Sequence, residues 1–297
     1  MSAPEERTRV AVLGAGLIGI DLADKIRCSP GLDLRLIAGR SRSSVGLARA
    51  AAMGIATSAG GIDAVVASGP YDVVFDASNA TAHAAHWQAL EPTGTTLIDL
   101  TPSRLGTLVV PTINGGQAAG ARHINLISCG GQAAIPILAA FARHCAPTCI
   151  EVVSTGASAS AGRATRLNLD EYIATTQSAI RTFTGTEAVK VLVNLSPAQP
   201  PPPFRVVMTV LAPELPSPAA NRAIRVAAAQ VAAYAPGFTV TSVSADEGRV
   251  TVAVEVTARG GRMPAYAGNL DIINGTALLL AEQHAAAPAR RRSPACR

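Results

Sequence analysis

A glycine-rich segment near the start of the chain constrains its fold more than any other feature of the sequence. Its residues are Gly14, Ala15, Gly16, Leu17, Ile18 and Gly19, which fit the pattern G-x-G-x-x-G. A buried strand is predicted over Thr8–Leu13 before this segment, and a helix over Ile20–Arg27 after it. Between a strand and a helix, this pattern is typical of a dinucleotide-binding loop.

Each glycine of this loop has a predicted role. Gly14 permits the tight turn, Gly16 lets the backbone approach a pyrophosphate, and Gly19 allows the helix to pack closely on the strand. The start of the helix then supplies backbone N–H donors to the phosphates. The alternative interpretation is a glycine turn that binds no ligand.

The first half of the chain alternates between predicted strands and helices. Such alternation favours right-handed βαβ units and a parallel sheet. The strands are predicted at Leu34–Ala38, Val73–Asp76, Thr96–Asp99 and Asn125–Ser128, and the helices at Val45–Met53, His83–Leu90 and Ala133–His144.

The second half has a different pattern, typical of an α+β domain. Strands are predicted at Ile150–Ser154, Val189–Asn194, Arg205–Leu211, Phe238–Ser244 and Arg249–Thr257, with helices at Leu169–Arg181 and Ala219–Tyr234. A last helix, Asn269–His284, is expected to return to the first domain. The predicted organisation is a Rossmann dinucleotide-binding domain over 1–130 with the returning helix 266–286, a second domain over 131–265, and a disordered basic tail over 287–297.

Composition excludes several other classes of protein. Hydrophobic residues make up 48% of the chain and charged residues 15%, which is enough apolar material for a full core. The net charge of +5 is concentrated in the tail, which holds Arg290, Arg291, Arg292 and Arg297. Because no basic stripe with interleaved aromatics occurs, nucleic-acid binding is not expected. No apolar run reaches membrane-spanning length and the N-terminus does not read as a signal peptide, so we expect a cytoplasmic protein.

The end of the second predicted strand bears on the choice of cofactor. An acidic residue is common there and binds the ribose hydroxyls of NAD, but this chain has Arg40, Ser41 and Arg42. Arginine binds a 2′-phosphate through charge-assisted hydrogen bonds, so NADP is slightly favoured over NAD. In the alternative interpretation both arginines are solvated and NAD binds without the acidic contact.

Among the five cysteines, Cys129 has the sequence context of a nucleophile. It follows a predicted strand and precedes a helix, where the positive end of the helix dipole is expected to lower the thiol pKa. The glycines Gly130 and Gly131 leave room for a carbonyl and are expected to expose backbone amides for an oxyanion. The alternative is a small buried residue. Cys145 and Cys149 have no second Cys/His pair nearby, so no metal site is predicted.

A thiol beside a dinucleotide site suggests aldehyde chemistry, and the motifs then identify a family. The chain resembles the CoA-dependent, acylating acetaldehyde dehydrogenases that partner 4-hydroxy-2-oxovalerate aldolases. The resemblance extends from Val10 to Glu282, and its matching segments are VAVLGAGLIG, GLARAAAMG, DVVFDAS, LIDLTPS, ISCGGQAAIP, SASAGRATRLNLDEY and MPAYAGNLDI.

The resemblance implies an enzyme, NAD(P)-dependent, with a semialdehyde-dehydrogenase-like α/β fold whose second domain binds substrate and dimerises. It implies that Cys129 carries an acyl thioester, that coenzyme A is a co-substrate, and that the chain forms a homodimer bound to an aldolase. It also implies cofactor contacts from Ala15–Ile18, from Asn269, and from a second stretch formed by Ser160, Ala161, Gly162, Arg163, Ala164, Thr165, Arg166, Leu167 and Asn168. Judged by residue type alone, that stretch is a small-residue loop, and Asn269 could cap the last helix.

Three departures from the family pattern stand out. Ser41, between two arginines, replaces a usual acidic residue, which weakens the expectation of strict NAD use. Val206 stands where the family has an aspartate proposed to activate the cysteine, and valine cannot accept a proton. The loop between Val243 and Arg249 is shorter than in typical members. The missing base and the arginines favour a relative that reduces an acyl-CoA for biosynthesis.

Two other functions stay open at this point. One is a phosphate-dependent semialdehyde dehydrogenase or acyl-phosphate reductase, although such enzymes pair the cysteine with a downstream histidine that no motif here supplies. The other is a non-catalytic subunit that binds a cofactor and an aldolase. His83, His86 and Trp87 either face the substrate or pack a helix, and packing is favoured.

Overall fold

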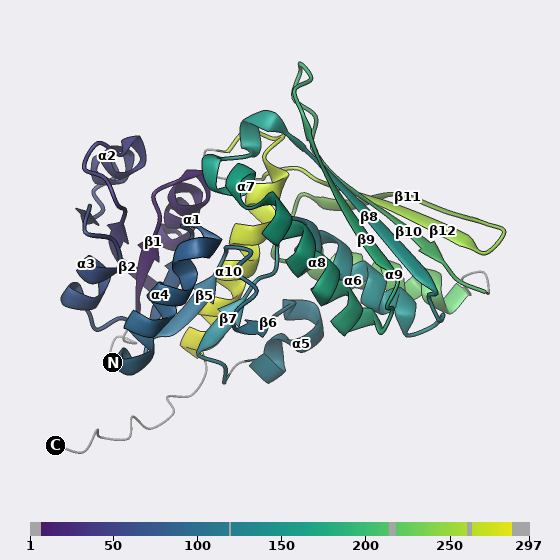
Figure 1. The fold of residues 1–297 in the computed structure, drawn as a ribbon, viewed down its shortest axis with the longest axis horizontal. Helices are drawn as coiled ribbons and strands as arrows, with labels where there is room; N and C mark the ends of the chain where they lie inside the picture. The colour runs from purple at the N-terminus through teal and green to yellow at the C-terminus, as the bar shows by residue number, and fades with distance from the viewer. Residues whose placement is uncertain (1–6, 119, 214–217, 260–262, 287–297) are drawn as a thin grey trace.

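The computed structural model describes residues 7–118, 120–213, 218–259 and 263–286. Two β-sheets dominate these residues, one in each half of the chain (Figure 1). This arrangement confirms the predicted α/β fold with an α+β second half. The predicted basic tail over 287–297 lies outside the described residues. No helix in the described ranges is long and apolar enough to cross a membrane.

The first sheet has seven strands in the order β3-β2-β1-β4-β5-β7-β6, and all of its pairings are parallel. Every residue of the short central strands β4 and β5 is buried, as expected for strands covered on both faces. The strands are β1 (Thr8–Leu13), β2 (Leu32–Ala38), β3 (Thr57–Ser58), β4 (Val73–Asp76), β5 (Thr96–Asp99), β6 (Thr107–Leu108) and β7 (His123–Asn125). The helices in this half are α1 (Leu17–Arg27), α2 (Val45–Ala52), α3 (Gly61–Ser68), α4 (Ala80–Leu90) and α5 (Pro111–Ala118).

The order of strands reverses at β1, which pairs with β2 on one side and with β4 on the other. In an open parallel sheet, the connections that leave the two neighbouring strands there run to opposite faces. A crevice therefore opens at the carboxyl ends of the strands, where ligands bind in this class of fold. The glycine-rich loop begins at that edge, directly after β1.

The second sheet has five strands in the order β11-β12-β10-β8-β9, with only the β8–β9 pairing parallel. Helices α6, α8 and α9 lie on one face of it (Figure 1). Buried and less buried residues alternate along β8 and β10, because one face packs on these helices. The strands are β8 (Cys149–Ala157), β9 (Val189–Ser196), β10 (Phe204–Leu211), β11 (Phe238–Asp246) and β12 (Arg249–Val256), and the helices are α6 (Cys129–Ala142), α8 (Leu169–Thr184) and α9 (Pro218–Ala232).

The last helix, α10 (Gly268–Ala286), returns to the first half of the chain as predicted. Its Asn274 side chain donates to Asp21 Oδ2 at 2.8 Å and to the Ile18 carbonyl at 3.1 Å. Asp271 also pairs with Lys25 at 2.9 Å. These contacts hold α10 against α1, directly behind the glycine-rich loop.

Several predicted boundaries were wrong. The strand predicted at Asn125–Ser128 ends at Asn125, and the helix predicted from Ala133 begins at Cys129. Gly130 and Gly131 continue this helix because the Ser128 hydroxyl caps it, accepting from the Gly131 N–H at 2.9 Å. A short helix, α7 (Arg163–Leu167), and a 3₁₀ turn over Ser158–Ser160 occupy the predicted small-residue loop. The helices α3 and α5 were missed because each is short and contains or borders glycine.

Candidate active site

The glycine-rich loop has the geometry predicted for it. Gly14 has a φ of 104°, and a side chain there would overlap the Ala77 carbonyl at the end of the neighbouring strand. A Cβ at Gly19 would overlap the Gly14 carbonyl, so the close packing of α1 on β1 requires glycine. At Gly16, in contrast, a Cβ would meet nothing within 4 Å. Gly16 therefore leaves open the space beside the start of α1.

That space is part of a cleft of about 900 Å³ that begins at the glycine-rich loop. Gly14–Ile18 line it, whereas Gly19 lies behind them. Arg40 and Ser41 also line the cleft, but Arg42 does not. Arg49, an exposed residue of α2 that the sequence analysis did not select, lines the cleft as well. A cleft of this size and position fits a dinucleotide.

The second predicted stretch contributes to the same cleft in part. Gly162, Arg163, Ala164 and Thr165 line it. Other members have structural contacts. Arg166 donates to the Ser158 carbonyl at 2.8 Å and to the Ala161 carbonyl at 3.2 Å, and Leu167 is 69% exposed. Ser160 and Ala161 are buried below the cleft, and Asn168 lines the pocket described next.

A smaller pocket adjoins the cleft and contains Cys129. The pocket and the cleft form one continuous space, because they share seven lining residues. These are Ile18, Ala77, Ser78, Asn79, Ala164, Thr165 and Leu270. The rest of the pocket lining includes Thr101, Pro102, Asn168, Tyr172 and Asn269. Among the described residues that line this pocket there is no Asp, Glu, His, Lys or Arg.

Asn269 lies just inside α10 and does not cap it. Its Nδ2 donates to the Ser160 carbonyl at 3.3 Å, and its Oδ1 is buried without a hydrogen-bond partner among the described residues. The capping interpretation was therefore wrong. A buried carbonyl oxygen that faces a pocket and lacks a donor suits a ligand that carries N–H groups, such as a carboxamide.

Cys129 is the first residue of α6 and is half-buried. Its Sγ lies 3.5 Å from the Tyr172 hydroxyl, and the same hydroxyl accepts from the Gly130 N–H at 2.9 Å. Burial raises the pKa of the Cys129 thiol, while the hydrogen bonds from Tyr172 and from backbone amides lower it. The expected lowering of the pKa was wrong, because burial outweighs the donors at the helix start.

The expected oxyanion donors are also already used. The Gly130 N–H bonds to Tyr172, and the Gly131 N–H bonds to Ser128. Ser128 makes a second hydrogen bond, 2.7 Å long, to Thr176 on α8. The N–H groups of Gly130 and Gly131 are therefore engaged within the protein rather than free for a ligand.

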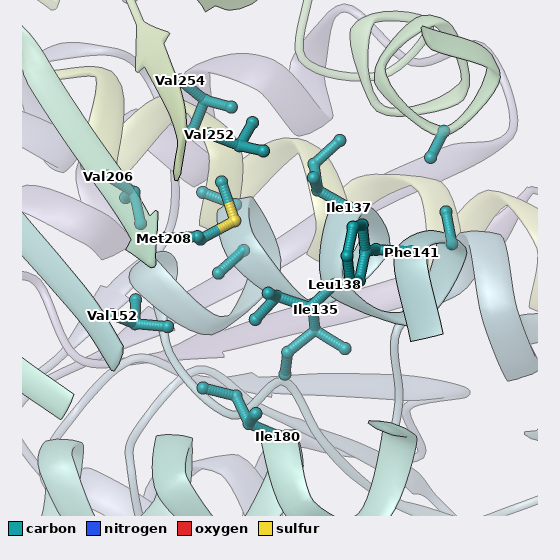
Figure 2. Close-up of a cluster of buried hydrophobic side chains, with 14 of the residues drawn as sticks. Ile135, Ile137, Leu138, Phe141, Val152, Ile180, Val206, Met208, Val252 and Val254 are labelled. Atoms are coloured by element: carbon teal, nitrogen blue, oxygen red, sulfur yellow. The ribbon is translucent and has the colours of Figure 1, made fainter. Parts of the chain in front are cut away.

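Val206 has no access to the pocket. It is fully buried on β10, among the apolar side chains that connect the second sheet to its helices (Figure 2). Val152 and Val254, on the neighbouring strands, belong to the same cluster. The position at which the family resemblance implies an aspartate is thus part of the core in this chain.

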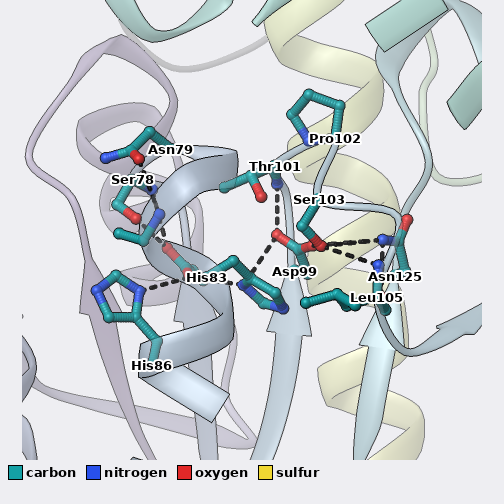
Figure 3. Close-up of polar contacts among 12 residues, drawn as sticks. Ser78, Asn79, His83, His86, Asp99, Thr101, Pro102, Ser103, Leu105 and Asn125 are labelled. Atoms are coloured by element: carbon teal, nitrogen blue, oxygen red, sulfur yellow. Dashed lines mark hydrogen bonds and ion pairs between the residues drawn. The ribbon is translucent and has the colours of Figure 1, made fainter. Parts of the chain in front are cut away.

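A buried histidine–aspartate network lies at the carboxyl ends of β4 and β5 (Figure 3). Asp76 Oδ2 lies 2.8 Å from His83 Nδ1 and 2.7 Å from His86 Nδ1. His83 Nε2 lies 2.8 Å from His123 Nε2, and Trp87 stacks on the His123 ring. His83 and Trp87 therefore pack the helix, as favoured, while His86 also lines the cleft.

The carboxylates of this network differ in their titration. Burial opposes ionisation of Asp76, but hydrogen bonds from His83 and His86 outweigh it and hold its pKa below the usual range. Burial raises the pKa of Asp99 to about 7. Asp76, His83 and Asp99 have ligand atoms within 4.8 Å of one another, a spacing that a metal ion could also use. Hydrogen bonds within the protein already engage these atoms.

Comparison with solved structures first defines the class of fold. The chain is similar to aspartate semialdehyde dehydrogenase II from Vibrio cholerae, solved in complex with ASA, with a TM-score of 0.62 over 94% of this chain and 98% of that one. At 13% sequence identity this likeness concerns the fold alone. The structure thus has the two-sheet fold of a semialdehyde dehydrogenase.

Sequence comparison then identifies the family. The acetaldehyde dehydrogenase of Streptomyces griseus is 52% identical over 96% of this chain and 92% of its own length. That of Pectobacterium atrosepticum is 41% identical over 93% of this chain and 95% of its own. The family model for the dimerisation region of prokaryotic acetaldehyde dehydrogenase matches residues 129–264. The chain belongs to the acetaldehyde dehydrogenase family, which confirms the resemblance seen in its motifs.

Some residues of the pocket were missed by the sequence analysis. Ser78, Asn79 and Thr101 directly follow the buried strands β4 and β5, so their position at a strand end could have indicated them. Tyr172 lies within α8 and has no such local signal. Only the packing of α8 against the start of α6 brings its hydroxyl to Cys129.

Proposed function

We propose that this protein is an NAD(P)-dependent acylating aldehyde dehydrogenase that interconverts an aldehyde and an acyl-CoA through a thioester on Cys129. The observation that carries the proposal is the position of the Cys129 thiol, in a pocket continuous with a dinucleotide-sized cleft. The name shared by its relatives, acetaldehyde dehydrogenase, supports an aldehyde as the substrate.

The chemistry follows from a thiol in this setting. As a thiolate, Cys129 forms a bond to the aldehyde carbon, and the carbonyl oxygen takes up a proton to give a thiohemiacetal. Loss of a hydride from that carbon and of the hydroxyl proton then leaves a thioester. The thiol of CoA then takes the acyl group and releases Cys129. A bound nicotinamide cofactor supplies or accepts the hydride. The apolar wall of the pocket, which includes Ile127, Leu270 and Ile273, limits access of water to the thioester.

The cofactor would be held by three parts of the chain. The Gly14–Ile18 loop and the start of α1 would face a pyrophosphate, and Gly162–Thr165 line the same cleft. Asn269 Oδ1 offers an acceptor to a carboxamide. We propose NADP rather than NAD, because the guanidinium groups of Arg40 and Arg49 line the cleft near the end of β2.

We further propose that the enzyme works in the acyl-CoA-reducing direction and forms a homodimer. The arginine-lined cleft and the absence of an aspartate base at Val206 support reduction. The dimerisation region of the family model, over residues 129–264, supports a homodimer. An aldolase that takes the aldehyde is the partner that the family resemblance implies.

A spectrophotometric assay of the purified protein tests this function. Acetyl-, propionyl- and aromatic acyl-CoA would each be supplied with NADH or NADPH, and consumption of the reduced cofactor followed by its absorbance. We expect turnover that is faster with NADPH and that disappears in Cys129→Ala. Cys145→Ala is the matched control, because Cys145 is half-buried outside the pocket. No turnover with any pair, while NADPH still binds, would favour a non-catalytic subunit instead.

The phosphate-dependent alternative has less support. None of the five histidines lines the Cys129 pocket, so the histidine base of that class has no counterpart there. The same assay distinguishes the two, because an acyl-phosphate reductase would ignore acyl-CoA.

A further inference from the structure

The Cys129 pocket poses an electrostatic problem. A thiolate is the reactive form of cysteine, yet burial disfavours its charge. No basic side chain lines the pocket among the described residues, and Val206 lies in the core. Besides Cys129 itself, the lining residue with a titratable side chain is Tyr172.

The Tyr172 hydroxyl lies where it can donate a hydrogen bond to the sulfur. Its oxygen accepts from the Gly130 N–H at 2.9 Å, which leaves the hydroxyl hydrogen free to point elsewhere. Cys129 Sγ lies 3.5 Å away, within hydrogen-bonding distance for sulfur. Burial raises the pKa of Tyr172 well above its usual range, so the phenol keeps its proton and acts as a donor rather than as a base.

The surrounding structure holds Tyr172 in this place. Tyr172 is 7% exposed, and its helix is joined to the cap of α6 by the 2.7 Å hydrogen bond between Thr176 and Ser128. Gly130 allows the close approach, because a Cβ there would overlap the hydroxyl oxygens of both Tyr172 and Ser154. Residues from α6 and α8 together therefore fix the distance between the phenol and the sulfur.

We propose that Tyr172 is a catalytic residue whose hydroxyl donates a hydrogen bond to the Cys129 sulfur and stabilises the thiolate that attacks the substrate carbonyl. This inference rests on the proposed function. When the thiolate forms its bond to the acyl carbon of an acyl-CoA, the CoA sulfur leaves with the electron pair of the broken bond. The Cys129 thiol releases a proton to solvent, and the CoA thiolate takes one up. The protons therefore balance, and Tyr172 transfers none.

Alkylation of Cys129 by iodoacetamide tests this role without any substrate. Its rate would be followed by mass spectrometry across a range of pH in the wild type, in Tyr172→Phe and in Tyr234→Phe. Tyr234 is a suitable control, because its hydroxyl is also buried, while the residue lines neither the Cys129 pocket nor the cleft. We expect alkylation of Tyr172→Phe near neutral pH to be about tenfold slower, with the rate recovering at high pH. Tyr234→Phe should match the wild type.

Two further measurements separate a chemical role from a structural one. In turnover of acyl-CoA, the pH profile of Tyr172→Phe should move to higher pH, and a lower rate with an unmoved profile would overturn the proposal. If Tyr172→Phe does not fold, 3-fluorotyrosine can replace tyrosine in the unchanged chain. The more acidic phenol is a stronger donor, so the apparent thiol pKa should fall, and an unchanged value would contradict the role.

These experiments distinguish this inference from the proposed function. A wild type without acyl-CoA turnover, combined with slow alkylation in Tyr172→Phe, would refute the proposed function but retain the effect of Tyr172 on the thiolate. Normal turnover of the wild type, combined with identical alkylation rates in all three proteins, would support the proposed function but refute the effect of Tyr172 on the thiolate.

Discussion

At the scale of single residues, Asp99 shows how strongly the fold changes the chemistry of a side chain. Its carboxylate is fully buried and accepts from the Thr101 N–H at 2.7 Å and the Ser103 hydroxyl at 2.5 Å. Burial nevertheless dominates and raises its pKa from 3.8 to about 7. Between these values the folded chain keeps a proton that the unfolded chain has lost. The contribution of Asp99 to stability therefore decreases as pH rises through this window.

An Asp99→Asn variant should reveal this dependence. Asparagine does not titrate, so the free energy of unfolding of the variant should not decrease through this window as that of the wild type does. Relative to the wild type, it should therefore rise by on the order of 2 kcal/mol between about pH 5 and pH 8. The measurement is the free energy of unfolding in denaturant at both pH values. Asp246→Asn, at an exposed strand end, is the matched control. If the free energy of unfolding of the wild type instead increased relative to that of Asp99→Asn as pH rises, Asp99 would already be ionised beside His83.

Residue identity alone selected some of the candidate site and missed the rest. Cys129, the glycine-rich loop and Arg40 could be predicted, because a strand end or a motif places them. Asn269 was indicated by the family resemblance alone, whereas Arg49 and Tyr172 take their positions from helices that approach the site from different parts of the chain. Residue type and spacing along the chain contain no information on those approaches.

At the scale of elements, the turn from β1 into α1 separates two uses of glycine. Gly19 is required by packing, since a Cβ there would overlap the Gly14 carbonyl. Gly16 has no neighbour within 4 Å of such a Cβ, and its φ of −79° is accessible to alanine. One glycine thus supports the fold, while the other keeps the cleft open.

Matched alanine substitutions should separate these uses. Gly19→Ala should lower the free energy of unfolding by roughly 1–3 kcal/mol, because the added methyl overpacks the turn. Gly16→Ala should keep wild-type stability but weaken NADPH binding at least tenfold, because its methyl occupies the space for the pyrophosphate. Thermal unfolding and titration of cofactor fluorescence measure the two effects. Full NADPH affinity in Gly16→Ala would show that the cofactor does not approach this loop.

At the scale of the whole molecule, the described helices that cover the second sheet lie on one of its faces (Figure 1). On its other face lie the neighbouring residues Val153 and Val207, with Leu192 and Leu211 each 39% exposed. A sheet face with such apolar side chains suits a second copy of the chain, in agreement with the proposed homodimer.

A charge at the centre of this face should disrupt the dimer. Val207→Asp should give a monomer in light scattering, since an aspartate there would be buried without a partner in the interface. Val226→Asp is the control, because Val226 is 58% exposed on α9, on the helix-covered side. A wild type that is itself monomeric, or a Val207→Asp protein that stays dimeric, would exclude this face as the interface.

The sequence by itself determined the fold class, the parallel sheet of the first half, the glycine-rich loop between β1 and α1, and the selection of Cys129 as a candidate. These features depend on hydrophobic periodicity and on glycines at strand ends, which are local properties of the chain. Only the tertiary structure decided that Cys129 begins its helix, that burial raises its pKa, and that Tyr172 lies beside it. Such properties arise from desolvation and from contacts between segments distant in sequence, such as Cys129 and Tyr172, and neither cause is encoded in a local pattern.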